Sequence, residues 1–189
     1  QMHLERNKSD RKDALRICEY GIERNPPLYE MPDSAYFSCK SLNNAIESLT
    51  NQVTVLKNQI HAIEKIPNAE KLVIKCYEDI IKTMQQKIKN LEQTLMLKLA
   101  VWQPELVAQV QSVTGIGKRA TSALIVYTQG FKNTHSYQQL ISYAGLSPRE
   151  YSSGSSIRGK ARICKQGGNG LRHILYMCAL NAKSTNPAC

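Results

Sequence analysis

The stretch that decides the fold is LNNAIESLTNQVTVLKNQIHAI, residues 42–63. Its apolar residues recur at spacings of four and three without a break, which predicts one long helix with a coiled-coil seam. β-branched residues at one seam position alternate with mainly leucine at the other, a pattern favoured in two-stranded parallel coils. The seam consists of Leu42, Ile46, Leu49, Val53, Leu56, Ile60 and Ile63.

A second apolar stripe follows this seam after an interruption at Pro67 and Asn68, and it continues to about Leu99. We expect Asn68 to cap the second helix. Two arrangements are open: the second helix folds back on the first as an antiparallel hairpin, or its stripe pairs with another subunit. In both cases the stripe predicts packing rather than chemistry. Its members are Val73, Tyr77, Ile80, Met84, Ile88, Leu91 and Leu95.

On the N-terminal side, residues 7–24 predict a helix with Ser9 as its N-cap. Asp10 and Asp13 lie three residues apart, so both carboxylates project from the same face of the first turn. Such a pair can share a divalent metal. Acids in a first turn also complement the helix dipole, which is the simpler interpretation of the residues alone. Residues 25–41 hold three of the seven prolines and predict a linker.

On the C-terminal side, Trp102 and Pro104 mark a boundary, and residues 104–128 predict a helix, a tight turn and a second helix. Gly115 and Gly117 lie in the turn, with Lys118 and Arg119 directly after it. This pattern resembles a helix-hairpin-helix, whose turn and helix N-terminus offer N–H groups to a nucleic-acid phosphate. A Gly-x-Gly by itself does not distinguish phosphate contact from a purely structural turn.

The segment YSSGSSIRGKARICKQGGNGLR, residues 151–172, alternates small residues with positive charge. Glycine lets a backbone approach a bulky anion, cations hold the anion, and a serine hydroxyl can act as a nucleophile. A solvated linker is the competing interpretation. The abrupt start of an apolar helix after the glycines favours a phosphate-binding surface. The cations are Arg158, Lys160, Arg162, Lys165 and Arg172.

Charge and cysteine usage limit the function classes. Residues 102–189 carry ten Lys and Arg against two acids, a net +8, whereas residues 1–101 carry fifteen against thirteen. The C-terminal part is therefore predicted to bind a polyanion. No long apolar run, lipidation motif or signal peptide indicates a membrane partner. Six cysteines without CxxC or His/Cys ligand spacing predict reduced thiols in a cytosolic protein.

The run AGLSPREYSSGSSIRGKARICKQGGNGLRHILYMCALNA, residues 144–182, resembles the C-terminal domain of insertion-sequence transposases of the "one-ten" family. This is the Piv/MooV type of bridge-RNA-guided recombinase, with a pattern of roughly AGLxPxxxxSGxxxxxxxIxKxGNxxLRxxLyxxA. The sequence departs from it at the doubled Gly167 and Gly168, at Cys164 and in loop length. KSDRKDA, residues 8–14, resembles the family's K-T/S-D-x-x-D-A motif, and the turn with Gly115, Ile116 and Gly117 stands at the place of its LxxIPGIGxxxA.

The resemblance implies a mainly α fold in three parts. Residues 1–32 would be the remnant helix of an RNase H-like, resolvase-type domain, residues 33–101 a coiled-coil linker and oligomerisation region, and residues 102–189 a serine transposase domain. The last part would hold the helix-hairpin-helix-like motif and the Ser/Gly loop, and would be truncated at its C-terminus. The chain starts at Gln1 and stops where the family continues. We therefore expect a fragment that is inactive alone.

The resemblance also implies the chemistry, which is DNA strand exchange through a phosphoserine link, guided by a bridge RNA. Ser153 precedes Gly154 at the family's Ser-Gly pair and is the first candidate nucleophile; Ser152 is the second. Asp10 and Asp13 would be the last two acids of a DEDD site for Mg²⁺. Nucleic-acid contacts are implied at Gly115, Gly117, Lys118, Arg119, Arg149, Arg158, Lys160, Arg162, Lys165, Asn169 and Arg172.

The expected partners are DNA, a guide RNA and another copy of the chain, with no membrane. The expected location is the bacterial cytoplasm, at the nucleoid when the protein acts. Two other function classes fit the residues: a non-catalytic nucleic-acid-binding module, and a coiled-coil assembly protein with an incidental basic tail. Absence of salt-sensitive nucleic-acid binding would favour the coiled-coil assembly protein over the recombinase and the binding module.

Overall fold

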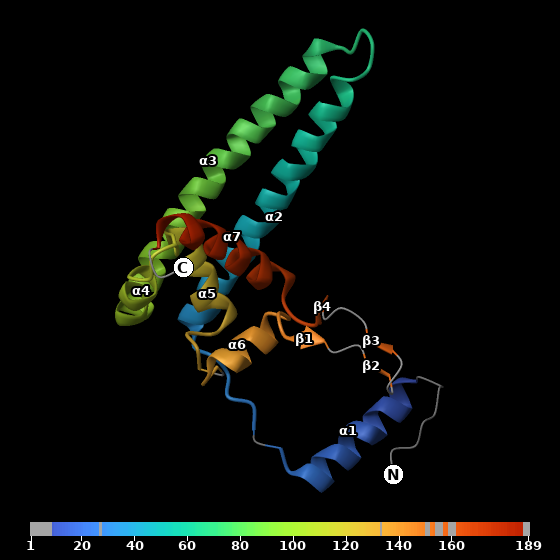
Figure 1. Cartoon of the computed structure of the whole chain (residues 1–189), viewed down its shortest axis with the longest axis vertical. Helices are drawn as coiled ribbons and strands as arrows, with labels where there is room; N and C mark the ends of the chain where they lie inside the picture. The colour runs from blue at the N-terminus through green and yellow to red at the C-terminus, as the bar shows by residue number, and fades with distance from the viewer. Residues whose placement is uncertain are drawn as a thin grey trace. The chain divides into compact units, whose positions relative to one another are not determined.

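The computed structural model describes residues 9–26, 28–132, 134–149, 152–153, 157–158 and 162–186. These residues are mainly helical, as predicted (Figure 1). The chain separates into two compact units, Gln1–Pro32 and Asp33–Cys189. No described helix is both long enough and apolar enough to cross a membrane.

The first unit contains one helix, α1 (Asp10–Arg24). Ser9 caps it as predicted, because its hydroxyl accepts the N–H of Lys12 at 3.4 Å. The helix ends at Asn25, whose left-handed backbone lets its N–H donate to the Gly21 carbonyl at 3.1 Å. None of the residues of α1 is buried.

The second unit begins with two long helices, α2 (Ser34–Ile63) and α3 (Lys71–Trp102), which pack together as an antiparallel hairpin (Figure 1). The short connection of residues 64–70 forces this direction and overrides the parallel preference of the seam. Asn68 does not cap α3. It lies in the connection with φ 58°, and Glu70 accepts the N–H of Leu72 at 3.4 Å instead.

The inner stripe of α3 lies one residue later than predicted near the connection. Ile81 is 8% exposed, whereas Val73 and Ile80 are 39% and 38% exposed. The predicted stripe has two successive spacings of four, at Ile80, Met84 and Ile88, whereas the packed stripe alternates spacings of three and four from Ile74 to Leu95. The two stripes share Tyr77 and the residues from Met84 to Leu95, and the more regular heptad is the one that packs. The stripe that packs against α2 contains Ile74, Tyr77, Ile81, Met84, Ile88, Leu91, Leu95 and Leu99.

The remaining helices are α4 (Pro104–Gln111), α5 (Lys118–Tyr127), α6 (Tyr137–Tyr143) and α7 (Asn169–Thr185). The central helix is α5, which is buried from Thr121 to Val126 and packs against α2, α3, α4 and α7. One core cluster joins the hairpin to α4 and α5, so the two predicted parts on either side of residue 102 form a single compact unit. This cluster consists of Cys39, Ile46, Leu95, Leu99, Val107, Ile125 and Val126.

Two short antiparallel strand pairs lie in the predicted Ser/Gly loop. In the first, β1 (Pro148–Arg149) pairs with β4 (Arg162–Ile163). In the second, β2 (Ser152–Ser153) pairs with β3 (Ile157–Arg158). The loop therefore contains extended, paired backbone that sequence periodicity did not predict. Gly154 and Lys160 lie outside the described residues.

Candidate nucleic-acid interface

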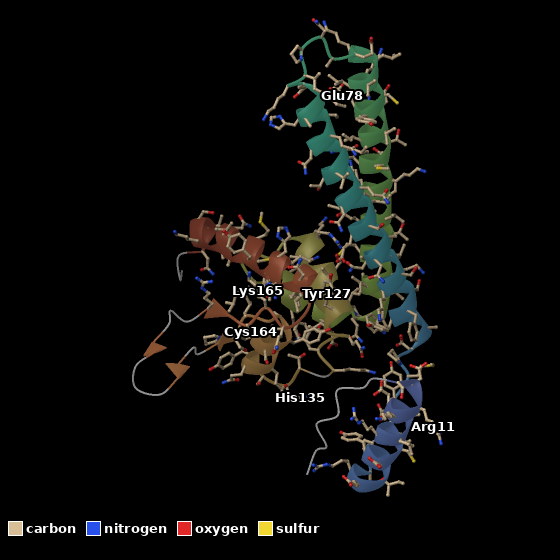
Figure 2. The ribbon with its side chains drawn as sticks, turned by 90° about the vertical axis from the view of Figure 1, so that its right-hand side faces the viewer. Arg11, Glu78, Tyr127, His135, Cys164 and Lys165 are labelled. Carbon is tan, nitrogen blue, oxygen red and sulfur yellow. The ribbon has the colours of Figure 1, made fainter. Side chains whose placement is uncertain are left out.

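The serine-bearing segment leaves and rejoins the helices at one place, between α6 and α7. The N–H of Cys164 donates to the Ser147 carbonyl at 2.9 Å, and the N–H of Lys165 donates to the Gly145 carbonyl at 3.1 Å. Figure 2 labels Cys164 and Lys165 in the stretch that leads from β4 into α7. We call residues 143–147 and 164–172 the base of the serine segment.

Two glycines are required in this base. Gly145 has φ 69°, and a Cβ atom there would lie 2.6 Å from the carbonyl oxygen of Gln166. Gly167 has φ 138°, and a Cβ atom there would collide with the carbonyl oxygen of Tyr143. Only glycine satisfies both the left-handed backbone and the close approach. The doubled glycine at 167–168 thus contributes the residue that packs against the end of α6.

Arg172 connects the two sides of the base. Its Nη1 donates to the carbonyl of Ala144 at 3.0 Å, and its Nη2 donates to Oδ1 of Asn169 at 3.1 Å. Sequence reasoning assigned both Arg172 and Asn169 to nucleic-acid contact. In the structure these two side chains are hydrogen-bonded to each other. Their contact with nucleic acid stays a prediction.

Ser152 and Ser153 differ in their cross-strand partners. The Cα register places Ser152 opposite Arg158 and Ser153 opposite Ile157. Directly opposite residues of an antiparallel pair are the nearest neighbours across the strands. The register therefore pairs Ser152 with a predicted phosphate-binding cation.

A second register position brings two cations together. Arg149 in β1 lies opposite Arg162 in β4. The register therefore places two residues predicted for nucleic-acid contact directly opposite each other in the β1–β4 pair.

The turn at residues 112–117 joins α4 to α5 and packs against α7. Gly115 has φ 102°, and a Cβ atom there would lie 2.8 Å from the Cβ of Ala182. Asn181 also donates to the Gly115 carbonyl at 3.4 Å. Gly117 is the N-cap of α5, and no side chain caps that helix. The first N–H groups of α5 therefore lack a side-chain acceptor and are suited to an anion.

A groove of about 760 Å³ lies between α2, the start of α5 and α7. It brings together four residues that the sequence predicted for nucleic-acid contact, namely Gly115, Gly117, Arg119 and Asn169. Lys118 lines a separate groove of about 740 Å³ between α3, α4 and α5, which Arg119 also reaches.

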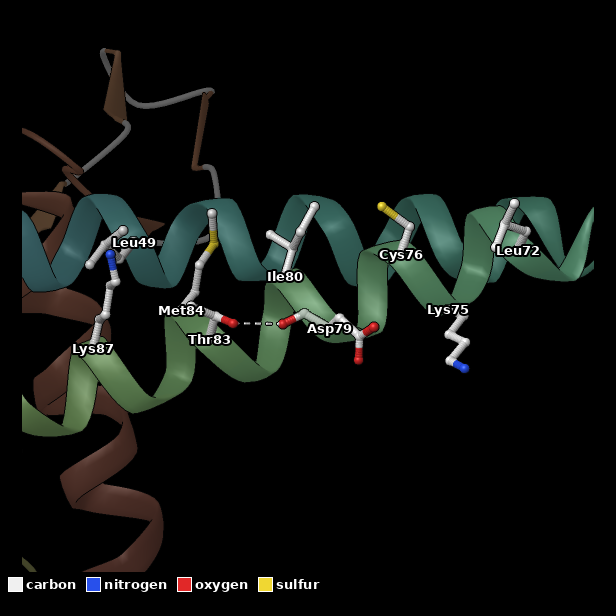
Figure 3. A pocket seen from close by; sticks show the side chains of 9 residues that line it. All are labelled: Leu49, Leu72, Lys75, Cys76, Asp79, Ile80, Thr83, Met84 and Lys87. Atoms are coloured by element: carbon white, nitrogen blue, oxygen red, sulfur yellow. Dashed lines mark hydrogen bonds between the residues drawn. The ribbon is translucent and has the colours of Figure 1, made fainter.

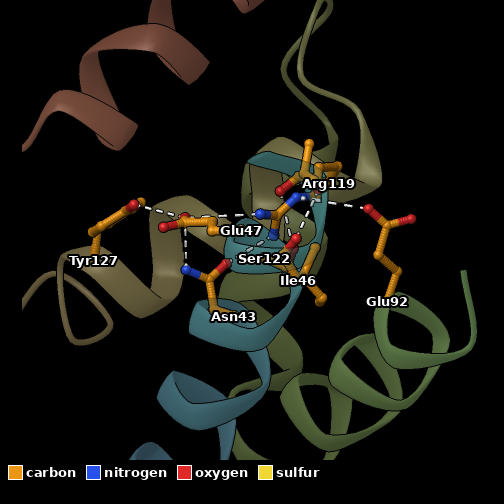
Figure 4. A network of polar contacts seen from close by, with 8 residues as sticks. Asn43, Ile46, Glu47, Glu92, Arg119, Ser122 and Tyr127 are labelled. Atoms are coloured by element: carbon orange, nitrogen blue, oxygen red, sulfur yellow. Dashed lines mark hydrogen bonds and ion pairs between the residues drawn. The ribbon is translucent and has the colours of Figure 1, made fainter. Parts of the chain in front are cut away.

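Arg119 is the centre of a polar network that joins three helices (Figure 4). Its Nη1 donates to Oδ1 of Asn43 at 2.7 Å, and Asn43 is fully buried. Its Nη2 lies 3.8 Å from Oε1 of Glu47, and its Nε lies 3.7 Å from Oε1 of Glu92. The guanidinium is thus surrounded by partners from α2 and α3, and its predicted phosphate contact stays untested.

Tyr127 extends this network toward α7. Its hydroxyl donates to Oε1 of Glu47 at 2.6 Å, and the side-chain amide of Asn43 donates to the same oxygen at 2.9 Å. Burial raises the pKa of Tyr127, and the hydrogen bond to Glu47 raises it further. Sequence reasoning missed this network. Its only signal was the presence of Asn43 and Glu47 directly beside the seam positions Leu42 and Ile46.

Asp10 and Asp13 lie exposed in the first turn of α1, as predicted. Across the described part of the chain, no group of three or more His, Cys, Asp or Glu side chains is arranged to hold a metal ion. Mg²⁺ prefers octahedral oxygen coordination and commonly takes one or two carboxylates with other ligands. The pair therefore fits as part of a Mg²⁺ site that needs ligands beyond these two side chains.

Fold and site together define a mainly helical protein with a basic, serine-bearing segment built on a glycine-rich base. Residues 107–189 match the family model described as "Transposase IS116/IS110/IS902 family", so this region of the chain is similar to members of that transposase family. This finding confirms the resemblance seen in the sequence.

Two curated relatives are similar to most of the chain. The pilin gene-inverting proteins of Moraxella lacunata and Moraxella bovis are each 31% identical to it over 183 residues. Each alignment covers 93% of this chain and 53% of the relative. The chain therefore spans about half the length of these relatives.

Proposed function

We propose that the complete protein is a DNA transposase or site-specific recombinase that uses a serine nucleophile. The match of residues 107–189 to a transposase family model and the similarity to two pilin gene-inverting proteins support the reaction class. The observation that carries the proposal for the site is the strand register, which sets Ser152 opposite Arg158 and Arg149 opposite Arg162. It brings a hydroxyl-bearing residue and several cations onto one short, paired segment.

In the proposed reaction, the hydroxyl oxygen of a serine attacks the phosphorus of a DNA phosphodiester and loses its proton. The bond from phosphorus to the leaving strand breaks, and that strand leaves as a hydroxyl after it takes up a proton. The resulting phosphoserine link keeps the bond energy. The hydroxyl of a new strand then attacks the same phosphorus, which restores the serine. The family pattern ranks Ser153 first, and the register adds support for Ser152.

The cations have a common role in this proposal. They would neutralise the charge that develops on the phosphate and hold the DNA backbone. The exposed cations best suited to this are Lys118, Arg162 and Lys165, because no contact in the described structure occupies their side chains with an acid. Arg149 and Arg158 join them by register, and Lys160 remains a candidate outside the described residues.

Asp10 and Asp13 would hold Mg²⁺ together with other acids, and the ion would supply electrostatic activation of the scissile phosphate. A guide RNA and pairing with another copy of the chain complete the proposal. The family resemblance is the support for the RNA. The exposed apolar strip on α3, which includes Leu72 and Ile80, supports the pairing.

A suicide DNA substrate tests the proposed function. The complete protein should gain the mass of one covalently attached DNA strand. Ser153→Ala should abolish this adduct and leave DNA affinity nearly unchanged, since one hydroxyl adds little to a binding energy set by cations. Adduct formation that persists in Ser153→Ala and disappears in Ser152→Ala assigns the attack to Ser152. DNA binding without an adduct in the intact protein supports a non-catalytic binding module instead.

A further inference from the structure

Arg172 has a geometry that differs from that of an exposed phosphate ligand. Its guanidinium donates in two directions, to the Ala144 carbonyl at 3.0 Å and to Oδ1 of Asn169 at 3.1 Å. Ala144 is the C-cap of α6, where the last carbonyls of a helix lack partners within the helix. One side chain thus satisfies an open carbonyl on α6 and fixes the first turn of α7.

The contact with Ala144 lies against a closely packed part of the fold. Ala144 and Leu171, the neighbour of Arg172, are both fully buried in one core cluster. A Cβ atom at Gly145 would lie 2.7 Å from Nη1 of Arg172. The guanidinium therefore lies directly on the Gly145 backbone, and no larger residue at 145 leaves it in place.

The same backbone is the point from which the serine segment departs. The Gly145 carbonyl accepts the N–H of Lys165, and the Ser147 carbonyl accepts the N–H of Cys164. These two hydrogen bonds join the two ends of the serine segment next to the β1–β4 pair. Along the chain β1 is followed by β2, which contains Ser152 and Ser153. A change in the direction of residues 144–147 therefore changes the direction of the whole serine segment.

We infer that Arg172 is a positioning residue for the serine segment and that it does not bind DNA phosphate. The inference rests on the proposed function, in which this segment carries the attacking serine. It moves Arg172 out of the group of phosphate-binding cations and gives it a geometric task. Lysine keeps the charge but lacks the rigid fork that reaches two acceptors in different directions, so charge and geometry are separable by substitution.

The test uses the complete protein with a suicide DNA substrate and the variants Arg172→Lys, Arg172→Ala and Lys165→Ala. Two quantities are measured: the rate of adduct formation at saturating DNA, and the slope of the logarithm of the binding constant against the logarithm of salt concentration. Both Arg172 variants should form the adduct about 100-fold more slowly, because a displacement of about 1 Å has that effect. Their salt slopes should equal that of the unaltered protein.

Lys165→Ala is the matched control because Lys165 is an exposed cation in the same base. It should reduce the magnitude of the salt slope by about 0.9, the value for one lost phosphate contact, which the Arg172 variants should not do. The inference is overturned if Arg172→Ala reduces the slope by that amount and Arg172→Lys restores both quantities. An unchanged adduct rate at saturation in Arg172→Ala overturns it as well.

Hydrogen exchange separates this inference from the serine chemistry. In Arg172→Lys the amides of Cys164 and Lys165 should exchange faster, whereas the amides in the buried part of α5 should keep their protection. Unchanged exchange at Cys164 and Lys165 contradicts the positioning role even if no adduct forms. Absence of an adduct in the unaltered protein contradicts the proposed function alone. If Arg172→Ala does not fold, Asn169→Ala provides a milder loss of one of the two contacts.

Discussion

At the scale of the residue, Asp33 shows how one carboxylate joins two segments that are far apart in the sequence. Its Oδ1 accepts the N–H of Tyr36 at 2.8 Å and caps α2, and its Oδ2 accepts the indole N–H of Trp102 at 2.8 Å. The backbone hydrogen bond from Tyr36 is the main reason why the pKa of Asp33 is lowered, and the Trp102 bond is the second. The carboxylate thus ties the start of α2 to the end of α3.

This arrangement predicts an acid-dependent signal. Because the pKa of Asp33 is lowered in the folded chain, its stabilisation is complete above the unfolded value of about 3.9 and is lost as the pH falls through the lower folded value. Trp102 is the single tryptophan, so its fluorescence reports the change directly. We expect an emission change with a midpoint below about 3.9, and Asp33→Asn should remove it. The same acid transition in Asp33→Asn would show that another group is responsible.

At the scale of the element, the contact between α5 and α7 depends on a glycine. A Cβ atom at Gly170 would collide with the hydroxyl of Tyr127. That hydroxyl is itself fixed by its bond to Glu47. The first turn of α7 can therefore lie against α5 only while residue 170 has no side chain.

We predict that Gly170→Ala destabilises the fold by about 1–3 kcal/mol, the usual range for overpacking. Tyr127→Phe should cost about 1 kcal/mol for the lost hydrogen bond. The double variant should lose less stability than the sum of the two single losses, because removal of the hydroxyl relieves the worst contact. The double variant should still be less stable than the unaltered protein, since the ring carbon Cζ of residue 127 would lie 3.0 Å from the new Cβ atom. Chemical denaturation measures all three variants.

Gly21 in α1 is the matched control for this experiment, because nothing lies within 4 Å of the place that its Cβ would take. Gly21→Ala should not destabilise the chain, and the higher helix propensity of alanine should favour α1. Strict additivity of the Gly170 and Tyr127 changes would contradict the proposed contact.

At the scale of the whole molecule, the hairpin of α2 and α3 leaves an apolar strip uncovered. Leu72, Cys76 and Ile80 of α3 line a groove of about 630 Å³, and Leu49 of α2 lies at the other end of this groove from Leu72 (Figure 3). Leu72 is 72% exposed, although it lies on the same helix as the stripe that packs against α2. Exposed apolar stripes on long helices commonly serve contacts between subunits.

We predict that the chain self-associates through this strip. The double variant Leu72→Lys and Ile80→Lys should shift light scattering toward the monomer and keep the helical circular dichroism signal. Ile81→Lys is the contrasting variant, because Ile81 is buried in the hairpin and its change should unfold α2 and α3. A monomeric unaltered chain, or an oligomer that the double variant does not affect, would contradict the prediction.

The sequence by itself determined the helices and the resemblance to a transposase family. The heptad spacing of residues 42–63, the cap at Ser9 and the glycine turn before α5 are local signals, because they depend on residues a few positions apart. The run from residue 144 to residue 182 carried the family pattern in the same way. The structure and the family comparison confirmed these features.

The tertiary structure decided which surfaces meet. The neighbours Ile80 and Ile81 on α3 are both apolar, and packing against α2 buries Ile81 and leaves Ile80 38% exposed. Arg119 meets Asn43 across 76 positions, and Arg172 meets Ala144 across 28. Local periodicity specifies a helix and its apolar side, but it carries no signal for the distant partner of a polar side chain. That partner is set by how closely the backbones approach, as at Gly145 and Gly170.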